Sequence, residues 1–315
     1  MFNASFPRLC APRHGRIAIM VGVIIACCVA SEQGRAEARS APTVATAQAF
    51  TSDRLSVEVM GQGPDVVLIP GLASSREIWR PLATRLAATH RVHLVQLAGF
   101  AGEPWSHGDG AFVAPEVEAL AAYIQRTGLD RPAIIGHSMG GLSGLLLAQS
   151  HPERVGRLMT VDSLPFYSAM FGPTVTAEQA APFAAQAAGV ILSADDATFQ
   201  AQQVQTAASL ARDPATREAM VGWSLASDRH ALASAMKDVM TTDARPGLAA
   251  MTTPVTALYA SDADGGAPAA LADATWNREY ATLPGVRLIR VDDARHFIMA
   301  DQPARFDALV DAFLK

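Results

Sequence analysis

The chain has 315 residues, of which 50% are hydrophobic, so it is long enough to bury a sizeable core. Charged residues make up 17%, too few for an intrinsically disordered or coiled-coil chain. With 25 basic and 30 acidic residues the formal net charge is −5, and this balance argues against a protein that binds nucleic acid. A globular domain of enzyme size remains.

The first 38 residues are typical of an export signal. Arg8, Arg13 and Arg16 precede the apolar run 17–30, and a polar stretch of small residues follows it. This run is shorter than the roughly 20 residues that span a membrane. Because Ala36-Glu37-Ala38 offers a cleavage site, we expect residues 1–38 to be a signal peptide and the protein to be periplasmic or secreted.

Two alternatives remain open for this leader. The segment that ends at Cys27 resembles a bacterial lipoprotein box, which would make Cys27 a lipidated residue, and an uncleaved leader would also act as an anchor. We expect contact with a membrane only in these two cases. All three cysteines lie in the leader, so cleavage after Ala38 leaves a chain without thiols. Residues 39–50 are rich in Ala, Thr, Ser and Pro and are interpreted as a linker to a domain over 51–315.

Strand and helix patterns alternate along this domain. Short apolar or alternating runs predict strands at 55–60, 66–69, 92–97, 133–135, 158–161, 255–259 and 286–291. Helical candidates lie at 78–88, 113–126, 142–149, 267–281 and 303–314. This alternation predicts an α/β fold, in which helices cover both faces of a doubly wound, mostly parallel sheet.

Residues of about 166–250 interrupt the alternation. They are rich in Ala, Gln and Met, and they contain no good strand run. A helical insertion between two strands of such a sheet is best placed over the carboxyl edge of the strands, where ligands bind in open α/β sheets. We therefore predict a helical cap there.

A short motif carries the chemistry. Gly136, Ser138 and Gly140 form a Gly-x-Ser-x-Gly pattern between a predicted strand and a predicted helix. The two glycines remove the side chains that would collide in a sharp turn, so the serine hydroxyl projects above the sheet beside the positive end of the helix. Ser138 is the candidate nucleophile.

With this motif the chain resembles the α/β-hydrolase superfamily, in its capped lipase- and esterase-like branch. The resemblance covers about Leu55 to Lys315 and includes the segment His151–Val155 after the motif helix. It implies an α/β-hydrolase fold with the cap between strands 6 and 7 of the superfamily's usual count. It also implies a serine hydrolase that cleaves a carboxylic ester through an acyl-enzyme intermediate. Acyltransferase, perhydrolase or carbon–carbon hydrolase activity remains an alternative, as does a non-catalytic lidded binding protein.

A serine hydroxyl needs a base within hydrogen-bond reach. His296 follows the last predicted strand and precedes the last helix, which is where the superfamily places its catalytic histidine. The acid that orients this histidine follows the preceding predicted strand in the superfamily. Asp262 is the preferred candidate there, with Asp264 as an alternative. Asp162 lies at another position that the superfamily uses for its acid, and it also stays open.

The resemblance also assigns two donors for the oxyanion. One is the backbone N–H of Met139, directly after the candidate nucleophile, and the other is that of Leu72, in the loop after the strand 66–69. Pro70 replaces the histidine that the superfamily often has in this loop, which leaves a backbone donor unaffected.

Several residues are candidates for an apolar substrate pocket beneath the cap: Trp105, Phe166, Met170 and Trp223. No motif with metal-ligand spacing occurs, so we expect neither a metal nor another cofactor. The expected partner is a small-molecule ester, and the sequence implies no protein partner.

Overall fold

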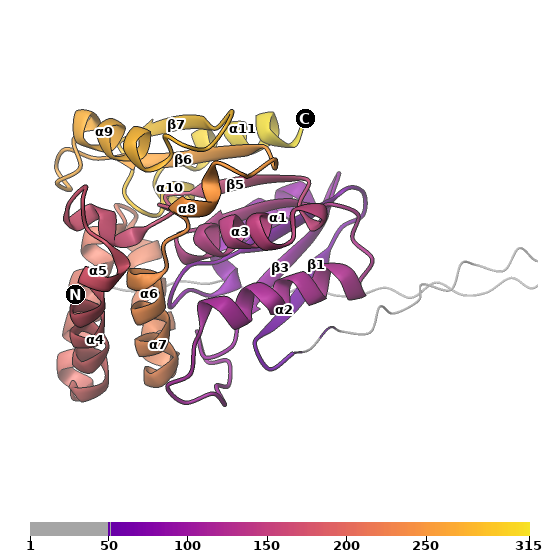
Figure 1. Cartoon of the computed structure of the whole chain (residues 1–315). Coiled ribbons are helices and arrows are strands. Elements are labelled where there is room, and N and C mark those ends of the chain that lie inside the picture. Colours follow the sequence, from indigo (N-terminus) through magenta and orange to yellow (C-terminus); the bar gives the residue numbers. More distant parts are fainter. Residues whose placement is uncertain (1–49, 51) are drawn as a thin grey trace, which may run out of the picture. The chain divides into compact units, whose positions relative to one another are not determined.

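The computed structural model describes residue 50 and residues 52–315 (Figure 1). The predicted signal peptide, its cleavage site and Cys27 lie outside the described residues. None of the helices in the described part is both long and apolar enough to cross a membrane.

Seven strands form one sheet in the order β1-β3-β2-β4-β5-β6-β7 (Figure 1). The strands are β1 (Leu55–Met60), β2 (Asp65–Ile69), β3 (Arg91–Leu97), β4 (Ala133–His137), β5 (Arg157–Val161), β6 (Val255–Ser261) and β7 (Arg287–Asp292). Only the β1–β3 pair is antiparallel; the other neighbours are parallel. The predicted doubly wound, mostly parallel sheet is confirmed.

Both faces of the sheet are buried, as β2 shows. Val66 and Leu68 belong to one hydrophobic cluster, whereas Val67 and Ile69 belong to the other. Because successive side chains of a strand point to opposite faces, a strand covered on both sides needs a continuous apolar run, and this strand has one.

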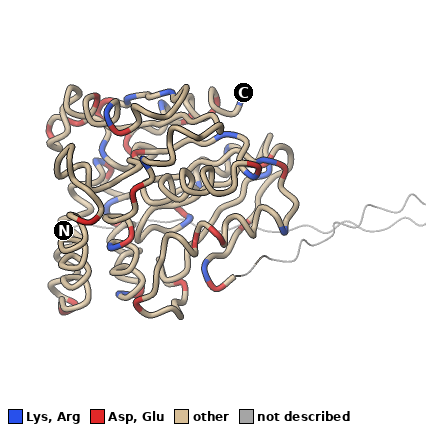
Figure 2. Tube along the Cα trace, in the orientation of Figure 1, with Lys and Arg blue, Asp and Glu red and all other residues tan. Residues whose placement is uncertain are grey.

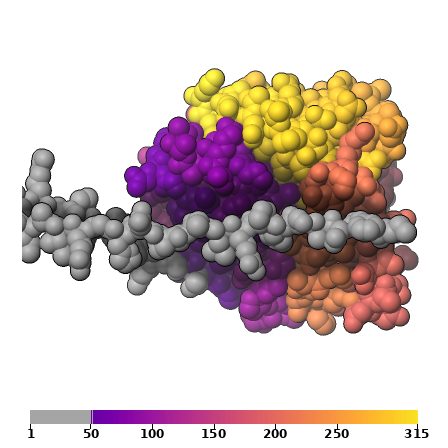
Figure 3. Space-filling view, turned by 180° about the vertical axis from the view of Figure 1, so that it is seen from behind, coloured from indigo at the N-terminus to yellow at the C-terminus, as the bar shows by residue number. Residues whose placement is uncertain are grey.

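Helices cover each face. The first cluster, which contains Val67 and Ile69, includes residues of α2 (Val113–Arg126) and α3 (Met139–Ser150), with the end of α9 (Ala269–Glu279) beside it. The second cluster, which contains Val66 and Leu68, includes residues of α1 (Arg80–Leu86), α10 (Ile298–Asp301) and α11 (Pro303–Leu314). A short 3₁₀ turn, η1 (Arg76–Trp79), leads into α1, and another, η2 (Pro152–Arg154), precedes β5. Arg85 of α1 forms an ion pair of 2.6 Å with Asp311 of α11, and Figure 3 shows C-terminal residues in yellow against the first third of the chain in purple.

Between β5 and β6 the structure has helices only, as predicted for the cap. These are η3 (Tyr167–Phe171), α4 (Ala177–Ser193), α5 (Asp196–Leu210), α6 (Pro214–Ala226), α7 (Arg229–Thr241) and α8 (Arg245–Leu248). Helix α4 packs along α7, and α5 packs against α6. Apolar residues of these helices join the two core clusters, because Phe199 packs in the first and Met220 in the second. The cap is therefore packed into the same cores as the sheet.

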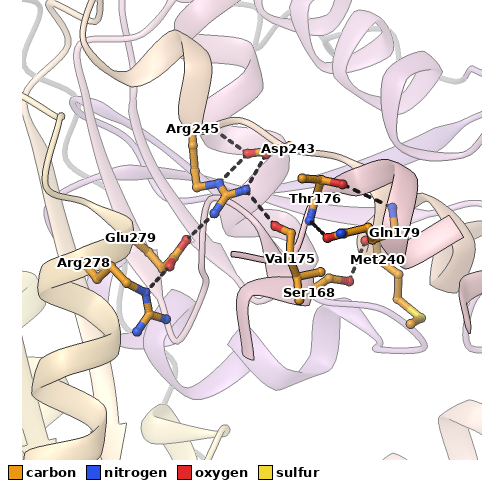
Figure 4. A network of polar contacts seen from close by, with 9 residues as sticks. All are labelled: Ser168, Val175, Thr176, Gln179, Met240, Asp243, Arg245, Arg278 and Glu279. Carbon is orange, nitrogen blue, oxygen red and sulfur yellow. Dashed lines mark hydrogen bonds and ion pairs between the residues drawn. The ribbon is translucent and has the colours of Figure 1, made fainter. Parts of the chain in front are cut away.

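A network around Arg245 ties the two ends of the cap to α9 (Figure 4). Its guanidinium pairs with Asp243 at 2.7 Å and with the buried carboxylate of Glu279 at 3.2 Å, and it also reaches the carbonyl oxygen of Val175. Arg278 pairs with the same Glu279 at 2.6 Å. Glu279 is nearly inaccessible to solvent, so two cations balance a charge that would otherwise be costly to bury.

Candidate active site

Ser138 occupies the sharp turn between β4 and α3. Its backbone has φ 54° and ψ −122°, a left-handed conformation that is costly for a residue with a side chain. A side chain at Gly140 would lie 2.5 Å from the carbonyl oxygen of Ile69, so only glycine fits there. The turn is held by a hydrogen bond of 2.9 Å from the Ser138 N–H to the Val161 carbonyl. The half-buried Ser138 side chain lines a cavity above the sheet.

His296 lies in the loop between β7 and α10 and lines the same cavity. Its Nδ1 is 2.7 Å from Oδ2 of Asp162. A carboxylate can only accept hydrogen bonds, so Nδ1 carries the hydrogen and Nε2 is the ring nitrogen left as a base.

Asp162 follows β5 directly, with a left-handed φ of 46°. Its backbone N–H donates to the Leu258 carbonyl at 2.8 Å, and its Oδ1 accepts a hydrogen bond of 2.9 Å from the Ala260 N–H. The neighbouring strand β6 thus fixes one carboxylate oxygen, while the other oxygen meets His296.

The structure corrects the preferred assignment of the acid. Asp262 does not bond to His296: its carboxylate pairs with Arg295 at 2.7 Å and with Arg212 at 2.9 Å. The Arg295 hydrogen bond is the main reason that the pKa of Asp262 lies below its ordinary value. Asp264, the other candidate in this loop, is exposed, and its backbone N–H donates to Asp262. Two arginines thus hold Asp262 in a different role, and Asp162 takes the position beside His296.

The loop after β2 approaches Ser138 closely. A Cβ atom on Gly71 would lie 3.0 Å from Cβ of Ser138, and a hydrogen bond from Ser74 N–H to the Gly71 carbonyl closes the loop. Within residues 52–315 the N–H of Leu72 donates to no protein acceptor. Met139 is the first residue of α3, where helix geometry leaves N–H groups without an intrahelical partner. Both predicted donors line the cavity.

His137, which precedes Ser138, contacts the main chain of His296. Its Nε2 lies 3.0 Å from the His296 carbonyl oxygen and therefore donates to it, and the two rings are 4.5 Å apart between centroids. Burial, and next the nearby His296, hold the pKa of His137 well below its ordinary value, so its ring is neutral. Sequence reasoning gave this residue no role, although its place inside the Gly-x-Ser-x-Gly motif was a signal.

The cavity has a volume of about 1030 Å³, and its roof is built by the cap. Met170, Phe183 and Val190 lie at its rim and are exposed. The cap residues that line it carry no charge: Tyr167, Ala169, Met170, Gly172, Pro173, Phe183, Gln186, Ala187, Val190, Ile191, Phe199, Gln202, Gln203, Thr206, Ser209, Leu210, Met220, Ser224, Leu232, Met236 and Val239. The ionised side chains of Asp262 and Arg295 in the lining pair with each other, and that of Arg278 pairs with Glu279.

Of the four aromatic or Met candidates for the pocket, only Met170 lines this cavity. Trp105 stacks on Phe112 at 5.1 Å and bonds to the Gly108 carbonyl, Phe166 is buried beneath Arg245, and Trp223 packs against the second core cluster. The structure thus places these three side chains outside the cavity, because each packs within the protein.

No group of three His, Cys, Asp or Glu side chains that could hold a metal ion occurs among the described residues.

Comparison with known proteins gives a family, partial relatives and the fold. A model of the alpha/beta hydrolase family matches residues 66–309. A pimeloyl-[acyl-carrier protein] methyl ester esterase of Aeromonas hydrophila is 40% identical over 116 residues, which are 36% of this chain and 44% of the relative. The enzyme of the same name from Citrobacter koseri is 37% identical over 35% of this chain and 41% of its own length. The chain thus matches less than half of the length of each of these relatives.

Solved structures are similar over most of the chain. A hydrolase of Pseudomonas aeruginosa superposes with a TM-score of 0.70 at 21% identity, covering 82% of this chain and 94% of its own. A thermophilic esterase of Thermogutta terrifontis gives a TM-score of 0.68 at 21% identity, covering 82% of this chain and 92% of its own. At these identities the likeness shows the fold.

Proposed function

The chain belongs to the alpha/beta hydrolase family, and from this premise we propose that it is a serine hydrolase that cleaves carboxylic esters. The observation that carries the proposal is the hydrogen bond of 2.7 Å between His296 Nδ1 and Asp162, beside a cavity that Ser138 also lines. A nucleophile, a base and an orienting acid from three separate loops are the parts that acyl transfer requires.

In the proposed reaction, Ser138 Oγ attacks the ester carbonyl carbon while His296 Nε2 takes its proton. Asp162 stabilises the imidazolium that forms. The N–H groups of Leu72 and Met139 bind the negative oxygen of the tetrahedral intermediate. When this intermediate collapses, the ester C–O bond breaks, and Nε2 gives its proton to the departing alcohol. Water then attacks the acyl-enzyme by the same steps, which releases the carboxylic acid and restores the Ser138 hydroxyl.

We further propose that the substrate has an uncharged apolar chain that lies under the cap. Support comes from the cavity roof, which has Met, Phe, Val, Ile and Leu side chains and no ionised group. Figure 2 shows that α4 is almost free of charged positions, and Glu178 is the only charged residue in its sequence. A charged group entering this roof would lose water without gaining a partner. The volume of about 1030 Å³ is at the upper end of ordinary small-molecule sites.

The test is labelling by a fluorophosphonate together with turnover of p-nitrophenyl esters. Wild-type protein is expected to be labelled at Ser138 and to hydrolyse the esters with a burst of p-nitrophenol. Ser138→Ala is expected to lose labelling and at least about 10⁴-fold in kcat. Ser150→Ala, which removes an exposed hydroxyl at the other end of α3, is the matched control and should behave as wild type. Labelling that persists in Ser138→Ala would reject the proposal, and a wild-type protein that binds esters without turnover would favour a binding protein.

We also propose that the protein is exported, on the basis of the basic and apolar segments of residues 1–38. Mass spectrometry of the protein made in its own host tests this. Cleavage after Ala38 is the expected result, whereas an intact Met1 would contradict it.

A further inference from the structure

The segment that carries Asp162 needs support from elsewhere in the fold. Asp162 is in a left-handed conformation that non-glycine residues keep only where the surroundings hold them. The contacts of Asp162 itself come from β6 and from His296. The residues on either side of it belong to the end of β5 and to the loop that enters the cap.

A single hydroxyl group bonds to the chain on both sides of Asp162. Tyr280, which follows α9, donates its O–H to the Ser163 carbonyl oxygen at 2.7 Å. The Oγ1 of Thr160 lies 3.1 Å from the same phenol oxygen. Because the phenol has one hydrogen and gives it to Ser163, Thr160 is the donor in the second bond. Tyr280 thus bonds to the residue two before Asp162 and to the residue directly after it.

The surroundings of Tyr280 favour a fixed, protonated phenol. The side chain is 1% exposed and packs in the first core cluster. Burial raises the pKa of Tyr280, so the hydroxyl keeps the hydrogen that it donates. Both bonding partners are also buried, so neither bond has water as a ready replacement.

We propose that Tyr280 is a positioning residue for the catalytic acid: its hydroxyl holds Thr160 and Ser163 so that Asp162 presents Oδ2 to His296 Nδ1. This inference rests on the proposed function, since it assigns Asp162 the role of the acid. It gives the geometry of the site a support from the residue that follows α9, in a segment that supplies no proposed catalytic group itself.

The test is Tyr280→Phe, which removes the hydroxyl and keeps the ring. If Asp162 loses its alignment, kcat should fall roughly 10- to 100-fold with little change in KM, because a small misplacement of a catalytic group costs rate. The acid limb of the kcat/KM–pH profile should also move to lower pH, because a misaligned carboxylate stabilises the imidazolium less. Tyr259→Phe is the control, since it removes a less buried phenol oxygen that bonds to Asp273 instead. It should keep the wild-type kcat and pH profile.

A double-mutant cycle separates positioning from general packing. In an Asp162→Asn background, Tyr280→Phe should change kcat less than about twofold, because the group that it positions is gone. A full Tyr280 effect in that background would overturn the inference, as would an unchanged kcat and pH profile in the single variant. Thr160→Val, which removes the second bond, is expected to shift kcat and the pH profile in the same direction by a smaller factor. It serves as the decisive variant if Tyr280→Phe fails to fold.

The two proposals fail in different ways. A Ser138→Ala protein that still turns over esters rejects the serine mechanism and the inference with it. If Ser138→Ala and Asp162→Asn are both inactive while Tyr280→Phe matches wild type, only the inference is rejected.

Discussion

Asp162 and Asp262 stand at the carboxyl ends of neighbouring strands, and their surroundings give them different roles. The carboxylate of Asp162 has a backbone N–H on one oxygen and His296 on the other. That of Asp262 has Arg295 on one oxygen and Arg212 on the other, so it balances two cations. A carboxylate that is already shared by two guanidinium groups is a poor partner for an imidazolium.

The two aspartates should therefore respond differently to substitution. Asp162→Asn is expected to lower kcat by roughly 10³- to 10⁴-fold with little effect on stability, because an amide cannot stabilise the imidazolium as a carboxylate does. Asp262→Asn should keep kcat within about threefold and lower the free energy of unfolding by about 1–3 kcal/mol, because its arginines lose a charged partner. Ester turnover and urea unfolding of both variants provide the measurement. If Asp262→Asn proves to be the inactive variant and Asp162→Asn the active one, the assignment of the acid is wrong.

At the scale of elements, helix α5 contributes polar but uncharged side chains to the cavity roof. Gln202, Gln203 and Thr206 line the cavity, whereas Gln205 is exposed and does not. Gln203 and Gln205 therefore lie two positions apart on one helix and differ in whether substrate can reach them. This pair tests whether the absence of charge in the roof sets the substrate preference.

Gln203→Arg should lower kcat/KM for neutral long-chain esters, because an apolar chain removes water from the new cation without pairing with it. It should raise kcat/KM for esters whose chain ends in a carboxylate, because the carboxylate pairs with the cation. We expect a shift of roughly tenfold or more in the ratio of the two kcat/KM values. Gln205→Arg, with the same change in charge outside the cavity, should leave the ratio unchanged. Equal shifts in the two variants would mean that the net charge of the protein, and not the roof, decides the preference.

At the scale of the whole molecule, a buried acid links the stability of the fold to pH. Glu116 of α2 is 1% exposed and lies in the packed face of α2, and neither of its carboxylate oxygens has a hydrogen-bond partner. The hydroxyl of Ser143 in α3 lowers the pKa of Glu116 by less than burial raises it, and it does not form a hydrogen bond of normal geometry with the carboxyl group. Burial raises the pKa of Glu116 from 4.5 to about 8, so the folded protein holds this side chain protonated at neutral pH.

This raised pKa makes the fold less stable as pH rises. The unfolded chain releases the Glu116 proton above about pH 4.5, and the folded chain releases it above about pH 8. The contribution of Glu116 to the free energy of unfolding is therefore fully present below about pH 4.5 and is lost once the pH passes about 8. Between them the free energy of unfolding should fall by up to about 1.4 kcal/mol per pH unit from this group. Urea unfolding of wild type and Glu116→Gln at pH 5 and pH 8.5 measures the difference. The variant should lose less stability, whereas Glu218→Gln, at an exposed position of α6 that forms no ion pair with another described residue, should follow wild type. Parallel behaviour of all three proteins would contradict the assignment.

The order of strands and helices, the position of Ser138 and that of His296 could be predicted from the sequence. Continuous apolar runs such as 66–69 are typical of buried strands, and a Gly-x-Ser-x-Gly pattern between a predicted strand and a predicted helix is typical of a sharp turn, so local pattern is sufficient there. These features depend on residues that are near one another in the chain, whereas the position of His296 followed from the resemblance to the superfamily.

Only the tertiary structure decided which aspartate reaches His296 and which side chains line the cavity. Asp162 and Asp262 both end strands of one sheet, and their roles follow from where the backbone turns and where Arg212 and Arg295 lie. Trp105 has the large aromatic side chain that is typical of pocket residues, yet it stacks on Phe112. The direction of a side chain depends on partners from distant segments, and a linear pattern does not contain that information.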